Sequence, residues 1–155
     1  MRDRKIGVRI DFHFNVEDRL QYACRVVRKA RAADKSVIAY AHEPARLARF
    51  DAALWIFSAL DFVPHVYVDS PLAARTPVLL TLDAALTAPA RDVFLNLDDE
   101  VPPGFNDLLS RFERIIEVVS REDGDRQKAR ERFRCYRAAG IEPNKFEMGG
   151  ATTSE

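Results

Sequence analysis

The sequence predicts an α/β fold, a single three-layer domain built on a mixed, mostly parallel sheet. Three observations predict it. Short apolar segments alternate along the chain with longer segments whose apolar residues recur at helical spacing, which is the order of strand–helix–strand units. The length of 155 residues suits one domain. An apolar content of 47% beside 31% charged residues is enough for a hydrophobic core.

The first half of the chain contains two strand–helix pairs. Residues 6–14 alternate apolar and polar side chains, as a strand does. A helix follows to about residue 33, with Asn15 as its expected N-cap and acidic residues in its first turn. Residues 36–40 form a short apolar strand, and the next helix has Pro44 in its first turn. Its expected inner face consists of Leu47, Phe50, Ala53 and Leu54.

The second half begins with three short apolar segments that we expect to be strands. They are residues 66–68, 77–82 and 92–97. A strongly amphipathic helix is expected from Phe105 to Val119, because apolar residues recur there at helical spacing.

The end of the chain should contain one more helix and a tail. The helix spans about 123–139 and ends at Gly140. We expect the domain to cover residues 1–145 and the polar segment 146–155 to be a flexible tail.

Charge and cysteine usage limit the function classes. With 24 basic and 24 acidic residues the net charge is zero, which argues against a general nucleic-acid coat and makes any such binding local. Basic residues prevail in 19–35 and 121–137, and acids in 92–107. Two cysteines, no membrane-length apolar run and no apolar leader segment favour a cytoplasmic protein.

The residues of a nucleotide-binding enzyme are missing from the sequence. No glycines stand at the spacing of a phosphate-binding loop, so the predicted domain is Rossmann-like without such a loop. Asp98, Asp99 and Glu100 follow a strand as Mg²⁺-binding acids do, which leaves a degenerate nucleotide hydrolase as an alternative. The three histidines have no metal-ligand spacing and Cys24 lies on a predicted inner helix face. We therefore expect no catalytic residue, metal or cofactor.

The predicted last helix gathers arginines on one side. At 100° per residue an arc of about 80° contains four of them, namely Arg126, Arg130, Arg134 and Arg137. Phe133 borders the arc, and Glu131 lies away from it, so we expect no acid on this face to neutralise the arginines. An arginine fork beside an aromatic wall suits the C-terminal carboxylate of a peptide that ends in an aromatic residue. A solvated basic helix face is the alternative.

A second cluster is aromatic. Trp55, Phe57 and Phe62 stand with Pro64 in a short connection between a helix and a strand. Connections usually run over the surface, where large aromatic residues often bind other proteins. A place in the core is the alternative reading.

These two segments together resemble the chi subunit family of bacterial DNA polymerase III. The pattern R-x-D-x-A-L-W stands at residues 49–55 and F-V-P-H at residues 62–65. The pattern A-R-E-R-[YF]-[KR]-x-Y-R-x-A-G stands at residues 129–140. The order of strands and helices also agrees over residues 5 to about 142.

The resemblance implies a non-catalytic accessory subunit of the DNA polymerase III holoenzyme in DNA replication. Such a subunit bridges the clamp loader, through the psi subunit, to the acidic C-terminal tail of single-stranded-DNA-binding protein, which ends in phenylalanine. The family's tail site carries over to Val119, Arg126, Arg130, Phe133 and Arg134, and its psi site to Trp55, Phe62, Val63 and Pro64.

The resemblance also implies roles within the tail site. Arg130 would hold the terminal carboxylate, Val119 and Phe133 would wall the phenylalanine pocket, and Arg126 and Arg134 would meet the acids of the tail. The family pattern admits Tyr or Phe at position 133; with Phe133 this chain lacks the hydroxyl group that Tyr would supply.

A third alternative is a module that binds single-stranded nucleic acid directly through the basic first and last helices.

Overall fold

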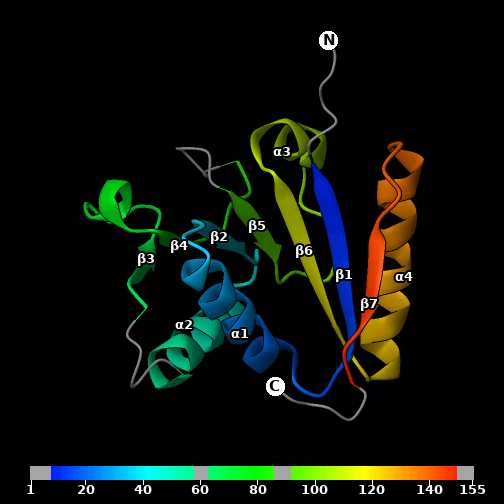
Figure 1. Ribbon diagram of the computed structural model, residues 1–155, viewed down its shortest axis with the longest axis horizontal. Helices are drawn as coiled ribbons and strands as arrows, with labels where there is room; N and C mark the ends of the chain where they lie inside the picture. The colour runs from blue at the N-terminus through cyan, green and yellow to red at the C-terminus, as the bar shows by residue number, and fades with distance from the viewer. Residues whose placement is uncertain (1–7, 58–62, 86–91, 150–155) are drawn as a thin grey trace.

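The structure, a computed structural model, describes residues 8–57, 63–85 and 92–149 (Figure 1). Seven strands form one sheet in the order β3-β4-β2-β5-β6-β1-β7, and all the paired strands are parallel. The strands are β1 (Arg9–Val16), β2 (Val37–Tyr40), β3 (His65–Tyr67), β4 (Val78–Thr81), β5 (Val93–Asn96), β6 (Arg114–Ser120) and β7 (Asn144–Glu147). The helices are α1 (Arg19–Ala32), α2 (Pro44–Phe57), the 3₁₀ turn η2 (Ala73–Arg75), α3 (Phe105–Arg111) and α4 (Asp123–Ala138).

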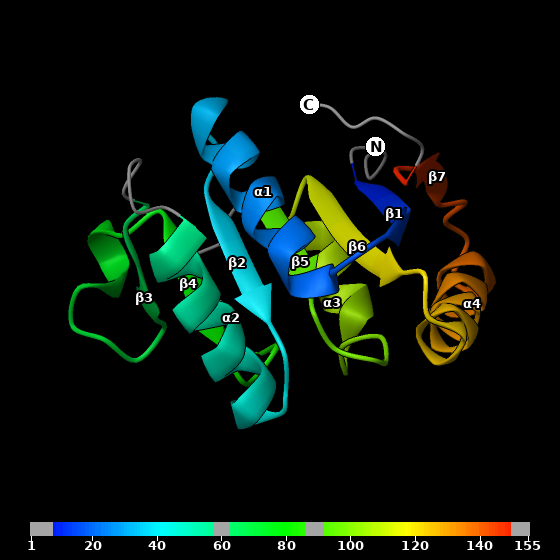
Figure 2. The same ribbon diagram turned by 90° about the horizontal axis from the view of Figure 1, so that it is seen from below.

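The helices cover both faces of the sheet. Figure 2 shows α1 and α2 on one face and α3 and α4 on the other. Alternate residues of a strand point to opposite faces, so Val37 and Ala39 pack under α1 and α2 while Ile38 and Tyr40 belong to the other core. The predicted three-layer α/β fold is confirmed, although the described sheet is wholly parallel instead of mixed.

The prediction of a helix from Phe105 to Val119 is wrong for the second half of this segment. Helix α3 ends at Arg111, Phe112 is extended, and Arg114–Ser120 forms the strand β6. β6 lies between β5 and β1, buried on both faces. A strand covered on both sides is apolar at nearly every position, so its sequence also fits helical spacing. The β-branched residues at 115–119 were the signal for a strand.

The ends of two helices refine the expectations. Asn15 does not cap α1; the side chain of Asp18 does, because it accepts a hydrogen bond from the Gln21 amide at 3.0 Å. Asn15 instead takes the left-handed conformation, with φ 67°, near the end of β1, where the register with β6 shifts between Phe14 and Val16. Helix α4 stops as predicted, and Gly140 follows it with φ 94°, a conformation that glycine adopts without strain.

The chain after α4 adds a strand that the sequence did not predict. β7 pairs with β1 and extends to Glu147, two residues into the segment expected to be the tail. The Met148 amide then donates to the Phe14 carbonyl at 2.9 Å. Among the described residues, no helix has the length and apolar character needed to cross a membrane.

Candidate functional site

A cavity of about 530 Å³ lies between α4 and the strands β1, β6 and β7. All five residues of the tail site predicted from the sequence line it, and so do five others. The lining residues are Phe12, Phe14, Val119, Arg126, Ala129, Arg130, Phe133, Arg134, Arg137 and Lys145. Helix and strands thus bring residues from both ends of the chain to one place.

The apolar part of this cavity is built on an aromatic pair. The rings of Phe12 and Phe133 lie 5.2 Å apart between centroids at an angle of 59°. Val119 is buried beside them in the same core cluster. The Lys145 ammonium stands 5.6 Å from the centroid of the Phe133 ring, within range of a cation–π interaction. An apolar floor therefore has positive charge next to it.

The arginines of the arc differ in their partners. Arg126 is 3.8 Å from Asp123, and Arg137 is 3.1 Å from Glu142. The expectation that no acid neutralises the arginine arc is therefore wrong at both ends of the arc. Asp123 lies on the same side of α4 one turn before Arg126, and Glu142, beyond the end of α4, reaches Arg137. Arg130 and Arg134 are exposed and make no ion pair within the described ranges. The central pair is thus the part of the arc open to an anionic ligand.

Besides Ala129 of α4, four lining residues were absent from the predicted tail site, for separate reasons. Phe12 and Phe14 come from the first strand, and the alternation that predicts this strand already places them on one face. Arg137 belongs to the predicted arc but was not assigned to the site. Lys145 lies in β7, an exposed strand with a single apolar residue, Phe146, so no apolar pattern marked it.

Four buried groups form an ionic network behind the cavity. Arg132 donates from Nε to the Glu117 carboxylate at 2.8 Å, with both side chains fully buried. Tyr136 and Asn96 donate to the other Glu117 oxygen at 2.7 and 2.9 Å. Burial raises the pKa of Tyr136 well above its usual value, and the negative charge of Glu117 adds to the effect. This network fixes α4 against β5 and β6.

The acids considered for an enzyme are tied to basic side chains. Asp98 accepts from His42 Nδ1 at 2.9 Å, and Asp99 accepts from Arg46 at 3.0 Å. Burial would raise the pKa of Asp99, but the hydrogen bond and charge of Arg46, with Arg19 and Lys128, lower it to about 2. No group of residues suited to a metal ion occurs in the described part of the chain. The geometry gives no support to a nucleotide hydrolase here.

The aromatic cluster lies at the end of α2, near the β3 edge of the sheet (Figure 1). Trp55 is 51% exposed and Ile56 is 77% exposed, whereas Phe57 is partly buried against the core. Pro64 is exposed and Val63 is buried, so Val63 supports this surface from below. Phe62, the remaining residue of the predicted psi site, lies outside the described residues.

A buried histidine supports the exposed tryptophan. The rings of Trp55 and His65 lie 4.7 Å apart between centroids. His65 Nδ1 is 2.7 Å from the Val63 carbonyl oxygen and Nε2 is 3.0 Å from an Asp51 carboxylate oxygen. Asp51 belongs to the sequence pattern that ends at Trp55, and His65 is the last residue of the second pattern. Their contact gives these two residues of the patterns a shared structural role.

The comparisons with known proteins agree on one family. A family model described as "DNA polymerase III chi subunit, HolC" matches residues 8–144. The chain is 35% identical over 136 residues to the DNA polymerase III subunit chi of Pseudomonas aeruginosa, an alignment that covers 85% of this chain and 91% of the relative. The subunit chi of Escherichia coli is 28% identical over 124 residues, with 80% and 82% covered. That of Haemophilus influenzae is 27% identical over 120 residues, with 77% and 81% covered.

Proposed function

Because the chain belongs to the DNA polymerase III chi subunit family, an accessory subunit that is not catalytic by itself, we propose that it bridges two protein partners during DNA replication. One partner is the acidic tail of single-stranded-DNA-binding protein, received in the cavity of α4. The other is the psi subunit, and through it the clamp loader, received at the surface around Trp55.

The observation that supports the tail site most strongly is the pairing of an apolar floor with two arginines that have no acidic partner in the described part of the chain. A C-terminal phenylalanine needs an apolar pocket for its ring and donors for its carboxylate. Phe12, Phe133 and Val119 supply the pocket. Arg130 supplies a fork of donors that can bind both carboxylate oxygens, and Arg134 meets an acid further up the tail.

The two surfaces lie far enough apart for both partners to bind at once. The cavity beside α4, called the tail cavity from here on, borders β7. The exposed surface around Trp55, called the Trp55 surface, borders β3. These two strands are the opposite edges of the sheet (Figure 1). Six strand spacings separate these edges, which is about 29 Å. A bridging subunit needs this separation, because partners that share one surface would exclude each other.

The test is a titration of the full chain with an acidic peptide that ends in phenylalanine. We expect micromolar affinity, about −8 kcal/mol, that weakens with added salt. Arg130→Ala should cost about 2 kcal/mol, or roughly thirty-fold in Kd, because it removes a charge-assisted contact. Arg121→Ala, an exposed arginine just before α4 that does not line the cavity, is the matched control and should bind normally.

The same peptide with an amidated C-terminus separates the proposed mechanism from general charge attraction. It keeps every acidic side chain and lacks only the terminal charge. If both peptides bind equally well, the cavity does not hold a carboxylate and the proposed tail site is wrong. The second partner is tested by binding of the purified psi subunit, which Trp55→Ala should abolish.

A further inference from the structure

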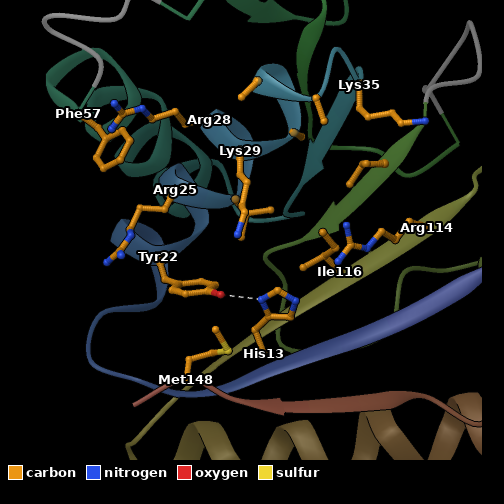
Figure 3. Close-up of a pocket in the computed structure, with 15 residues that line it drawn as sticks. His13, Tyr22, Arg25, Arg28, Lys29, Lys35, Phe57, Arg114, Ile116 and Met148 are labelled. Carbon is orange, nitrogen blue, oxygen red and sulfur yellow. Dashed lines mark hydrogen bonds between the residues drawn. The ribbon is translucent and has the colours of Figure 1, made fainter. Parts of the chain in front are cut away.

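A second and larger groove lies on the opposite face of the sheet from the tail cavity. Its volume is about 1000 Å³, and Figure 3 shows the side chains that line it. α1 forms one wall, and residues of β1 and β6 form the other. Phe57 and Met148 also line it. On this face α1 packs over β6, and none of the described helices covers β1 (Figure 2). The groove therefore forms beside α1, where the sheet extends beyond the described helices that cover this face.

Positive charge surrounds this groove. Among the residues that the structure describes, five permanent cations line it and no carboxylate does. The cations are Arg25, Arg28, Lys29, Lys35 and Arg114. Arg114 is 2.7 Å from the buried Asp11, and Lys35 is 3.4 Å from the exposed Glu113. Arg25 and Lys29 are exposed and make no ion pair within the ranges described. A chain with no net charge thus concentrates positive potential at one place, which favours a negatively charged ligand.

The floor of the groove contains a polar group with a hydrogen bond still to make. Burial lowers the pKa of His13 to about 4, with Arg114 adding to the effect, and burial raises the pKa of Tyr22. Nδ1 of the neutral ring lies 2.7 Å from the Tyr22 hydroxyl and shares a hydrogen bond with it. Nε2 is buried without a partner among the described residues, which is uncommon in folded proteins.

We propose that this groove binds the backbone of single-stranded DNA directly. A single strand carries one phosphate per nucleotide in a regular array, and the α1 cations stand in a row along one wall that can follow such an array. The guanidinium forks of Arg25 and Arg28 suit phosphate oxygens. The exposed Met148 side chain at this groove can pack against the face of a base.

An acidic peptide fits these observations less well. Its charges stand at the ends of flexible side chains, whose ordering costs entropy, and few peptides carry an acid at nearly every residue. Five cations around one groove match a strand that is charged at each unit. The family is also that of a DNA polymerase subunit, so single-stranded DNA is the polyanion next to which it works.

The experiment measures the fluorescence anisotropy of a labelled oligothymidylate with the full chain and no other protein, over a series of salt concentrations. Contacts to four phosphates predict that log K falls with log salt at a slope of about −3. The double variant Arg25→Gln/Lys29→Gln removes two contacts, so the slope should become about 1.4 shallower and the affinity at low salt should fall about tenfold. Arg75→Gln/Arg121→Gln, two exposed arginines that line neither cavity, is the matched control and should change neither quantity. Arg126→Gln/Arg130→Gln in α4 tests the tail cavity as the competing site for the strand.

Each outcome decides the proposal. No binding by the unaltered chain at low salt overturns it, and so does equal binding by the α1 variant. Loss of binding in Arg126→Gln/Arg130→Gln would show that the DNA binds in the tail cavity instead of this groove. Displacement of the oligothymidylate by polyglutamate at lower charge concentration assigns the groove to an acidic protein instead. If the α1 variant fails to fold, amide chemical shifts of the unaltered chain replace it; changes confined outside α1, β1 and β6 would then contradict the proposal.

Discussion

His65 directs both of its ring nitrogens at oxygen acceptors. The Val63 carbonyl oxygen lies at Nδ1 and the Asp51 carboxylate at Nε2, so the imidazole is held from both sides. These two contacts fix the position and orientation of the ring. Because the Trp55 ring lies on this imidazole, the pair of Asp51 and His65 also fixes the position of the exposed tryptophan.

This pair can be tested without any partner, because Trp55 is the single tryptophan of the chain and dominates its intrinsic fluorescence. Asp51→Ala should shift the Trp55 emission and reduce the unfolding free energy by about 1 to 2 kcal/mol, as loss of a partly exposed charge-assisted hydrogen bond would. The exposed Asp69, replaced by Ala, is the control. An unchanged emission spectrum in Asp51→Ala would mean that the pair does not position the tryptophan.

The buried ion pair between Arg132 and Glu117 makes a second prediction at this scale. Arg132→Met leaves the Glu117 charge buried without its cation, which should cost about 3 to 5 kcal/mol of unfolding free energy. The double variant Arg132→Met/Glu117→Gln removes both charges and should recover most of that loss. Urea unfolding of the two variants measures this. A double variant no more stable than Arg132→Met would contradict the explanation.

At the scale of elements, Asp99 holds three helices at the carboxyl edge of the sheet. It contacts Arg46 of α2 at 3.0 Å, Arg19 of α1 at 3.3 Å and Lys128 of α4 at 3.6 Å. In a nucleotide-binding α/β domain this edge is where the ligand binds. Here side chains of the protein itself occupy it. The feature that resembles an enzyme in the sequence is therefore a clamp between helices.

The clamp makes stability depend on acid pH. Burial raises the pKa of Asp99, but Arg46 and the neighbouring cations lower it from 3.8 to about 2, so its contribution is complete above about pH 4 and is lost as pH falls through 2. Unfolding free energy measured from pH 6 to pH 2 should show Asp99→Asn less stable at pH 6 and equal to the unaltered chain near pH 2. Asp107→Asn, an exposed acid, should show no such convergence. A constant difference across the range would refute the clamp.

The elements also show what a single sequence can and cannot predict. β1, β2, α2 and α4 follow from their periodicity, and the arginine arc follows from the spacing of α4 alone. β6 was taken for a helix because burial on both faces erases the alternation of a strand. β7 is not predicted because it is short, mostly polar and exposed, and its place depends on pairing with β1 at the far end of the chain. The spacing of residues in α4 therefore predicts the helical wall of the tail cavity. The opposite wall, to which Phe12 and Lys145 contribute, can be placed only when the order of the strands in the sheet is known.

At the scale of the whole molecule, the sheet separates the three surfaces that we propose as binding sites. The Trp55 surface adjoins β3, the tail cavity adjoins β7, and the basic groove opens on the α1 face between them. The central strands are buried on both faces and paired throughout, so binding at one edge has no hinge through which to act on the other.

Binding at the two edges should therefore be independent. Substitutions more than about 10 Å apart with no shared partner are additive within about 0.5 kcal/mol, which is roughly twofold in Kd. Trp55→Ala should leave the affinity for the acidic peptide ending in phenylalanine within that limit, and Arg130→Ala should do the same for the psi subunit. Saturating the chain with the peptide should likewise leave psi binding unchanged, measured by calorimetry. A larger mutual effect would require a conformational coupling across the sheet and would contradict a rigid bridge.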